Sequence, residues 1–301
     1  MKAIVDSYFL SRRAAGFDLR FWSRPLYDFA RHCAARRETF VHVKTAVAWA
    51  ATASTQGQRE ARLRKVASLA AFAHAADSRH ELVPTRIFVH CTNRRQTPFI
   101  FTREQIGSLL RAAAQLPPNP YLRPHTYVTL ISLLAATGLR VAEALALQVS
   151  NITEDGLVIH KTKFKKSRIV PVHPSVREGI AGYLRRRKSA DTDRIFIFDD
   201  GRPLRYSIVQ YTVQRLMKQI GLRATPGKPH ATLHSLRHTF AVRALEAAPT
   251  DKSQIEHHMM ALSTYLGHVH YSSTYWYLEK TPLILAQVSN AAEAIFFGGE
   301  R

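Results

Sequence analysis

The sequence predicts a mainly α protein of two domains, a small all-helical one followed by a larger helical one that carries a short antiparallel β-sheet. At 301 residues the chain is long for a single small core. Apolar residues recur at three-to-four spacing over much of it, which is typical of amphipathic helices. Residues 156–172 instead alternate around a lysine-rich centre and are rich in β-branched side chains, which favours a β-hairpin.

The first predicted domain, residues 1–83, consists of helices. Apolar residues recur at helical spacing in residues 4–21 and 26–35, and residues 58–76 form a longer amphipathic stretch. Four basic residues stand near the start of that stretch: Arg59, Arg62, Arg64 and Lys65. Such a run is usually a solvated face, but it can also follow a line of phosphates.

Residues 84–100 are predicted to form a basic linker, because prolines stand near both ends and Arg94 and Arg95 lie inside. The second domain, residues 101–301, follows. Thr102 and Gln105 form a capping-box pair that predicts the start of a helix. Gly138 predicts a helix end, and residues 194–198 predict a further short strand. From residue 206 onward the chain is mostly helical.

The charge of the chain indicates a polyanionic partner. Lys and Arg number 43 against 22 acidic residues, a formal charge of +21. Residues 1–95 hold 17 basic and 7 acidic residues, and the remainder holds 26 and 15. Positive charge on both domains favours two domains gripping nucleic acid over a basic tail on a neutral enzyme. A merely soluble, arginine-rich surface is the alternative.

Other features exclude several classes of protein. Cys33 and Cys91 lie far apart without metal-type spacing and are expected to be reduced thiols. The N-terminus does not read as a signal peptide, and the longest apolar run, residues 46–53, is too short to cross a membrane. We therefore expect a soluble, cytoplasmic protein directed to DNA or RNA, with no membrane partner.

Four short motifs carry residue types suited to phosphate chemistry. Arg140 follows a predicted helix end, with Glu143 three residues later. The lysine-rich hairpin comes next. His234 and Arg237 then share one face of a predicted helix. Finally, a Gly-His pair ending at His268 precedes three tyrosines. Each motif alone has a plain structural explanation, such as a helix cap, solvated lysines or packed aromatic rings.

In this order, the motifs resemble those of the tyrosine recombinases, also called the phage-integrase family, and are similar to its compact Xer-like members and to mobile-element recombinases. The motif resemblance covers about residues 101–280. It implies the tyrosine recombinase fold, with a core-DNA-binding first domain and a catalytic second domain. It also implies six catalytic residues: Arg140, Lys163, His234, Arg237, His268 and Tyr277.

The chemistry explains these residue types. Cleaving a phosphodiester without a metal requires a nucleophile, a proton donor for the leaving 5′ oxygen, and cations for the non-bridging oxygens. Arg140 and Arg237 supply charged planar forks that match phosphate oxygens. His234 and His268 resemble the family's proton-handling or phosphate-contacting positions. Glu143 resembles the acidic residue that orients the first arginine.

A hairpin lysine is implied as the general acid for the departing hydroxyl. Counting back from the strand-opening Arg168 points to Lys163, with Lys161 as the neighbouring alternative. Lys161, Lys165 and Lys166 are expected to contact DNA. No metal or other cofactor is expected. His234 and His238 have the i,i+4 spacing of zinc ligands, but no HExxH motif is present. A phosphotyrosine ester keeps the energy of the broken bond, so no ATP is needed.

Three tyrosines compete for the role of nucleophile. Tyr271 follows His268 too closely, and Tyr275 and Tyr277 point about 200° apart on a helix. The family's nucleophile follows its histidine by about two and a half helical turns, after a Ser/Thr-rich step. Residues 272–274 fit that step, which indicates Tyr277, with Tyr275 as the alternative.

The resemblance implies site-specific recombination of double-stranded DNA through a 3′-phosphotyrosyl intermediate and a Holliday junction, by a tetramer of this chain or one formed with a related recombinase. The alternatives are a non-catalytic DNA-binding relative and a type IB topoisomerase-like nicking enzyme.

Two local expectations remain. Residues 248–258 should contain an extra turn or loop, and an apolar helix at 281–297 should fold onto its own domain or dock onto a neighbouring protomer.

Overall fold

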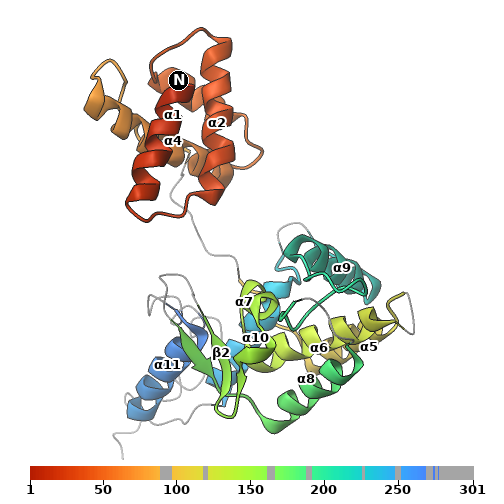
Figure 1. The fold of residues 1–301 in the computed structure, drawn as a ribbon. Helices are drawn as coiled ribbons and strands as arrows, with labels where there is room; N and C mark the ends of the chain where they lie inside the picture. The colour runs from red at the N-terminus through yellow and green to blue at the C-terminus, as the bar shows by residue number, and fades with distance from the viewer. Residues whose placement is uncertain are drawn as a thin grey trace, which may run out of the picture. The chain divides into compact units, whose positions relative to one another are not determined.

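The computed structural model describes residues 1–88, 97–117, 121–160, 167–187, 192–225, 228–247 and 252–268, together with Thr274 and Tyr277. The chain divides into two compact units, residues 1–95 and 96–301, each with a hydrophobic core of its own (Figure 1). Helices dominate both units and a small antiparallel sheet lies in the second, so the predicted mainly α class is confirmed.

The described helices of the first unit are α1 (Lys2–Ala14), α2 (Arg20–Ala35), α3 (Val43–Ala51) and α4 (Gln56–Ala76). Each of them contributes apolar side chains to one core, among them Val5, Phe29, Trp49 and Leu63. The apolar pattern of residues 4–21 does not run as one helix, because α1 ends before Gly16. That glycine has a φ of +81°, a left-handed conformation that does not continue a helix.

The described helices of the second unit are α5 (Arg103–Ala114), α6 (Leu122–Thr137), α7 (Val141–Ala146), α8 (Pro174–Arg186), α9 (Tyr206–Gln219), α10 (Leu233–Glu246) and α11 (Lys252–Leu266). α6 packs against α5, α8 and α10 and buries Tyr127, Leu130 and Leu134. The capping box that the sequence predicts at Thr102 opens α5, and α6 ends at Gly138 as predicted.

The sheet has the order β1 (Ile152–Thr153), β2 (Gly156–Ile159) and β3 (Arg168–Val170), and both pairings are antiparallel. β2 and β3 form the predicted hairpin, with Leu157 opposite Val170 and Ile159 opposite Arg168. α11 packs beside β3 (Figure 1). This packing brings the base of the hairpin and the end of α11 together.

One local expectation was wrong. Residues 194–198 make only isolated bridges, at Arg194 and Ile197, and the third strand of the sheet is β1. The apolar run is buried in the core instead of being paired along its length: Ile195 N–H donates to the Leu147 carbonyl. Of the range in which an extra turn or loop is expected, residues 252–258 belong to α11; residues 248–251, like the helix expected at 281–297, lie outside the described residues.

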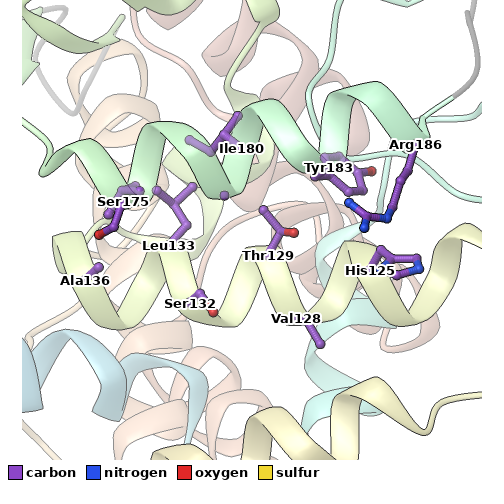
Figure 2. Close-up of a pocket in the computed structure, with 12 residues that line it drawn as sticks. His125, Val128, Thr129, Ser132, Leu133, Ala136, Ser175, Ile180, Tyr183 and Arg186 are labelled. Atoms are coloured by element: carbon purple, nitrogen blue, oxygen red, sulfur yellow. The ribbon is translucent and has the colours of Figure 1, made fainter.

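A groove with a volume of about 410 Å³ lies between α6 and α8. Figure 2 shows His125 and Arg186 at one end of it and Ser175 and Ala136 at the other. None of the residues that line it is one of the predicted site residues. Within the described ranges, no helix combines the length and the apolar character needed to cross a membrane.

Candidate active site

Arg140 stands at the turn between α6 and α7. Gly138 permits the turn, because its φ of +59° suits glycine and a Cβ there would lie 2.5 Å from the Phe240 ring. Arg140 occupies the N-cap position of α7, and Glu143 accepts from it twice: the Arg140 backbone N–H donates to Glu143 Oε2 (3.1 Å) and Nη1 donates to Glu143 Oε1 (2.8 Å). With 34% of its side chain exposed, Arg140 remains accessible to solvent.

Glu143 joins two arginines. Arg168, the first residue of β3, donates from Nη2 to Glu143 Oε2 (2.9 Å) and from Nη1 to Glu143 Oε1 (3.2 Å). Burial acts to raise the pKa of Glu143, but the hydrogen bonds and charge of Arg168 and the hydrogen bonds of Arg140 together outweigh it, and the pKa is lowered. Glu143 is therefore a carboxylate at neutral pH that ties Arg140 to the sheet.

α10 positions the second predicted arginine. A capping box of Thr232 and Ser235 opens the helix. Arg237 is only 2% exposed and donates to two backbone carbonyls, from Nη1 to Gly138 (2.8 Å) and from Nη2 to Leu266 (2.7 Å). Burial, and then the charge of Arg140, lowers the pKa of Arg237 to about 10, so it remains a cation at neutral pH.

The end of α11 is where the three arginines meet. Each donates to one of three successive carbonyl oxygens: Arg168 to Tyr265 (2.8 Å), Arg237 to Leu266 (2.7 Å) and Arg140 to Gly267 (2.9 Å). The last carbonyls of a helix have no partner inside the helix and carry partial negative charge, which suits cations. Gly267 has a φ of +65°, and a Cβ on it would lie 2.8 Å from Arg168 Nη1, so the close approach requires glycine.

His268 follows directly on this helix end. Its Nδ1 is 2.7 Å from Oγ1 of Thr274, a residue that is fully buried. The His268 ring lies nearly parallel to the Tyr277 ring, at an interplanar angle of 15° and a centroid distance of 6.3 Å. The histidine and the predicted nucleophile are therefore neighbours.

Tyr277 is buried, with 2% of its surface exposed. Its hydroxyl is 3.0 Å from Nδ1 of His238, which lies one turn along α10 from His234. The two histidine rings meet edge to face, with centroids 4.5 Å apart. The alternatives for the nucleophile, Tyr271 and Tyr275, lie outside the described residues.

The histidines of this cluster are neutral at pH 7. Burial, followed by the charges of neighbouring groups, lowers the pKa of His238 to about 3 and that of His268 to about 4. Desolvation, and then the charges of Arg237 and Arg140, also lowers the pKa of His234, although its side chain reaches the surface. Among the described residues of the site, the positive charge at neutral pH therefore comes from the arginines.

We expect the free energy of unfolding to fall as the pH is lowered from about 6.5 to about 4. In the unfolded chain these histidines gain protons near pH 6.5, whereas in the folded protein His238 and His268 resist protonation until about pH 3 and 4. The unfolded state then binds more protons, so stability is complete above pH 6.5 and declines by about 1.4 kcal/mol per pH unit for each histidine. Urea unfolding at several pH values measures this slope.

The control for the pH dependence of the unfolding free energy is a variant that lacks one of the two histidines. His268→Asn should reduce the slope between pH 4 and 6.5 by about 1.4 kcal/mol per pH unit, because one of the two shifted imidazoles is gone while His238 remains. Asp77, whose pKa is lowered from 3.8 to about 2, loses its contribution mainly below about pH 4, and glutamates with a lowered pKa, such as Glu143, contribute equally in both proteins, so the difference between the slopes reports His268. An unchanged slope in the variant would contradict the assignment.

The structure brings together five of the six predicted catalytic residues: Arg140, His234, Arg237, His268 and Tyr277. Lys163, Lys161, Lys165, Lys166, Arg94 and Arg95 lie outside the described residues. On α4, three of the predicted DNA-contacting residues reach back to their own unit: Arg59 to the Ala53 carbonyl, Arg62 to Thr52 and Lys65 to the Phe21 carbonyl. Arg64, whose side chain is exposed, is the fourth.

Three residues of the cluster were missed as site residues. Arg168 entered the sequence argument only as a marker for counting to the lysine, and an arginine that opens a strand carries no signal of its own. His238 was weighed only as a zinc ligand; its place beside the HxxR motif could have suggested a role with the tyrosine. Thr274 belonged to a Ser/Thr-rich step, and nothing in the sequence distinguishes it from Ser272 or Ser273.

Two comparisons with known sequences decide the family. Residues 100–283 match the model of the phage integrase family. A putative integrase/recombinase of Sinorhizobium fredii, y4rB, is 34% identical to this chain over 96% of each protein. The chain belongs to the phage integrase family.

The solved structures that resemble this chain have a fold consistent with this family. The Tn1549 transposon integrase, in complex with transposon right-end DNA, matches this family member with a TM-score of 0.67 over 98% of this chain and 99% of its own, at 16% identity. A lambda integrase dimer bound to a COC′ core site matches with a TM-score of 0.63 over 91% and 96%. The tyrosine recombinase XerD of Chlamydia pneumoniae is 27% identical over 60% of this chain and 57% of its own. This phage-integrase family member is a site-specific DNA recombinase of the tyrosine type.

Proposed function

We propose that this recombinase cuts and rejoins double-stranded DNA at specific sites through a covalent bond between Tyr277 and the 3′ phosphate. One observation carries the proposal: a tyrosine, two arginines and two histidines, drawn from segments up to 137 positions apart in the sequence, meet at the end of α11. Tyrosine, arginine and histidine together provide a nucleophile, charge for phosphate oxygens and groups for proton transfer.

Both arginines suit the phosphate because each guanidinium has further N–H donors beyond those that contact the protein. A guanidinium has five N–H donors in a planar fork. In Arg140 and Arg237, hydrogen bonds to backbone carbonyls and to Glu143 hold two nitrogens of each, which fixes the plane of the fork. The remaining donors would bind the non-bridging oxygens without a large rearrangement, and Glu143 would keep Arg140 in place.

The proposed reaction is a transesterification. The hydroxyl oxygen of Tyr277 attacks phosphorus and the bond from phosphorus to the 5′ oxygen breaks. The phenolic proton passes to His234, the histidine of the cluster whose side chain reaches the surface, His268 contacts the phosphate, and Lys163 gives a proton to the leaving 5′ oxygen. A 5′ hydroxyl from the partner DNA then reverses the step, and no external energy source is needed because one ester replaces another.

The proposed assembly is a tetramer of this chain, or one formed with a related recombinase, that passes through a Holliday junction. A lambda integrase tetramer bound to a Holliday junction is among the structures similar in fold to this chain, with a TM-score of 0.63. Residues 1–83 would bind core DNA through the basic face of α4, residues 84–100 would link the domains, and residues 101–301 would carry out catalysis. Since y4rB is named an integrase and Tn1549 is a transposon, we propose a mobile element as the host of this recombinase.

A plasmid assay tests the function. We expect the protein to cut and exchange strands only on supercoiled plasmid that carries the inverted repeats flanking its gene, and to do so in EDTA, since arginines supply the positive charge. Relaxation of any plasmid regardless of site would indicate a type IB topoisomerase-like enzyme, and binding without cleavage a non-catalytic relative. Loss of activity in EDTA that Mg²⁺ or Zn²⁺ restores would contradict the mechanism.

DNA binding should depend strongly on salt. If both domains neutralise phosphates through about 6–10 contacts, affinity should fall by about 10³–10⁵ between about 50 and 200 mM salt. Fluorescence anisotropy with a labelled site measures this slope. Arg64→Ala should reduce the slope by about one, because one released counterion is lost, and a nearly flat response in the wild type would contradict the two-domain clamp.

A further inference from the structure

The hydroxyl of Tyr277 contacts a residue to which the proposed reaction gives no role. Nδ1 of His238 lies 3.0 Å from the phenolic oxygen, a hydrogen-bonding distance. His238 follows Arg237 directly on α10 and lies one turn from His234, so this helix presents the phosphate-binding and the tyrosine-contacting groups side by side. The contact thus links the predicted nucleophile to the element that carries the second arginine.

We propose that His238 is a positioning residue that holds the Tyr277 hydroxyl in the orientation from which its oxygen attacks phosphorus. This inference rests on the proposed function. The neutral ring accepts the phenolic hydrogen at Nδ1, which requires the tautomer with its hydrogen on Nε2. His268 lies beside the tyrosine ring at an interplanar angle of 15°, and His238 sets the direction of the phenolic O–H bond.

The surroundings of His238 make it a holder of the hydroxyl and not the base that removes its proton. Burial, the neighbouring His234 and the charge of Arg237 lower the pKa of His238 to about 3. Such a ring stays neutral and accepts a hydrogen bond, but it binds a proton poorly. Holding an attacking atom in line is itself worth much, because a displacement of about 1 Å can cost about a hundredfold in rate.

Three substitutions separate positioning from proton transfer. The side-chain amide of asparagine reaches about where Nδ1 lies and can accept the hydroxyl, but it cannot take a proton. Leucine fills the space and offers no hydrogen-bonding group, and the amide of glutamine reaches towards the Nε2 position. We therefore expect His238→Asn to retain most of the wild-type rate, and His238→Leu and His238→Gln to lose about a hundredfold.

The measurement is the single-turnover rate of covalent adduct formation on a nicked suicide substrate at saturating DNA. The dissociation constant for DNA should be the same in all variants, since the contact acts after binding. His258→Leu is the matched control: it removes a histidine of α11 that lies 2.8 Å from the Ala244 carbonyl of α10, and it should leave the rate unchanged. If His238→Asn and His238→Leu lost the same factor in rate, His238 would be the base that accepts the phenolic proton. If His238→Leu reacted at the wild-type rate, the contact would only pack the two side chains. Either result overturns the proposal.

A second measurement needs no reaction. In ¹⁵N-histidine-labelled protein without DNA, Nδ1 of His238 should have the shift of an unprotonated nitrogen that accepts a hydrogen bond, and Tyr277→Phe should move it. If the Nδ1 resonance of His238 did not move in Tyr277→Phe, the contact would be overturned, independently of the rate of adduct formation. If wild-type protein forms no adduct, or Tyr277→Phe still forms one, the proposed function itself fails, which the NMR result distinguishes from a failure of the His238 proposal.

Discussion

Tyr277→Phe should abolish the covalent protein–DNA adduct on a suicide substrate while site binding persists. The substitution removes one oxygen, and without that oxygen no bond to phosphorus can form. The hydroxyl's contact with His238 is lost as well, at a cost to stability of about 1 kcal/mol. The fold and the DNA affinity should therefore survive, and denaturing gel electrophoresis of the quenched reaction should show free DNA only.

Two further phenylalanine variants complete this test. Tyr127→Phe removes another buried hydroxyl of the second unit, which bonds to Thr212 Oγ1 at 3.1 Å, and it should still form the adduct. Tyr275→Phe should also form it. If Tyr275→Phe lost the adduct while Tyr277→Phe kept it, the nucleophile would be Tyr275.

Arg237→Lys should slow adduct formation by about 10²–10³ and leave site binding nearly unchanged. Arg237 serves two purposes, because it bonds the carbonyls of Gly138 and Leu266 and would face the phosphate with its remaining donors. A lysine keeps the charge but cannot satisfy both carbonyls and a phosphate oxygen at once. The rate of adduct formation and the dissociation constant, measured on the same duplex, separate the two effects.

Arg243→Lys is the matched control for Arg237→Lys. Arg243 lies on the same helix and donates from Nη2 to the Phe101 carbonyl at 3.0 Å, outside the cluster. This variant should react at the wild-type rate. Arg237→Ala is less suitable, since it would leave two buried carbonyls without their donor, at a cost to stability of about 1–3 kcal/mol each. A wild-type rate in Arg237→Lys would contradict the role given to this arginine.

The sequence by itself determined the local elements and the residue types of the site. Capping at Thr102, the helix end at Gly138 and the hairpin around residues 156–172 depend on neighbours in sequence, so short-range rules predicted them correctly. The order of the Arg, Lys, His-x-x-Arg and Gly-His motifs was sufficient to indicate the family. Residues 194–198 were predicted wrongly, because an apolar β-branched run shows burial but not whether a partner strand is available.

Only the tertiary structure decided how the site is held together. The meeting of Arg168, Arg237 and Arg140 on three successive carbonyls at the end of α11 joins segments as much as 127 positions apart, and no local pattern encodes such a contact. The same holds for the sharing of Glu143 between two arginines and for the contact of His238 with Tyr277. The reason is physical: helix ends leave carbonyls without partners, and which cations reach them depends on how the helices pack.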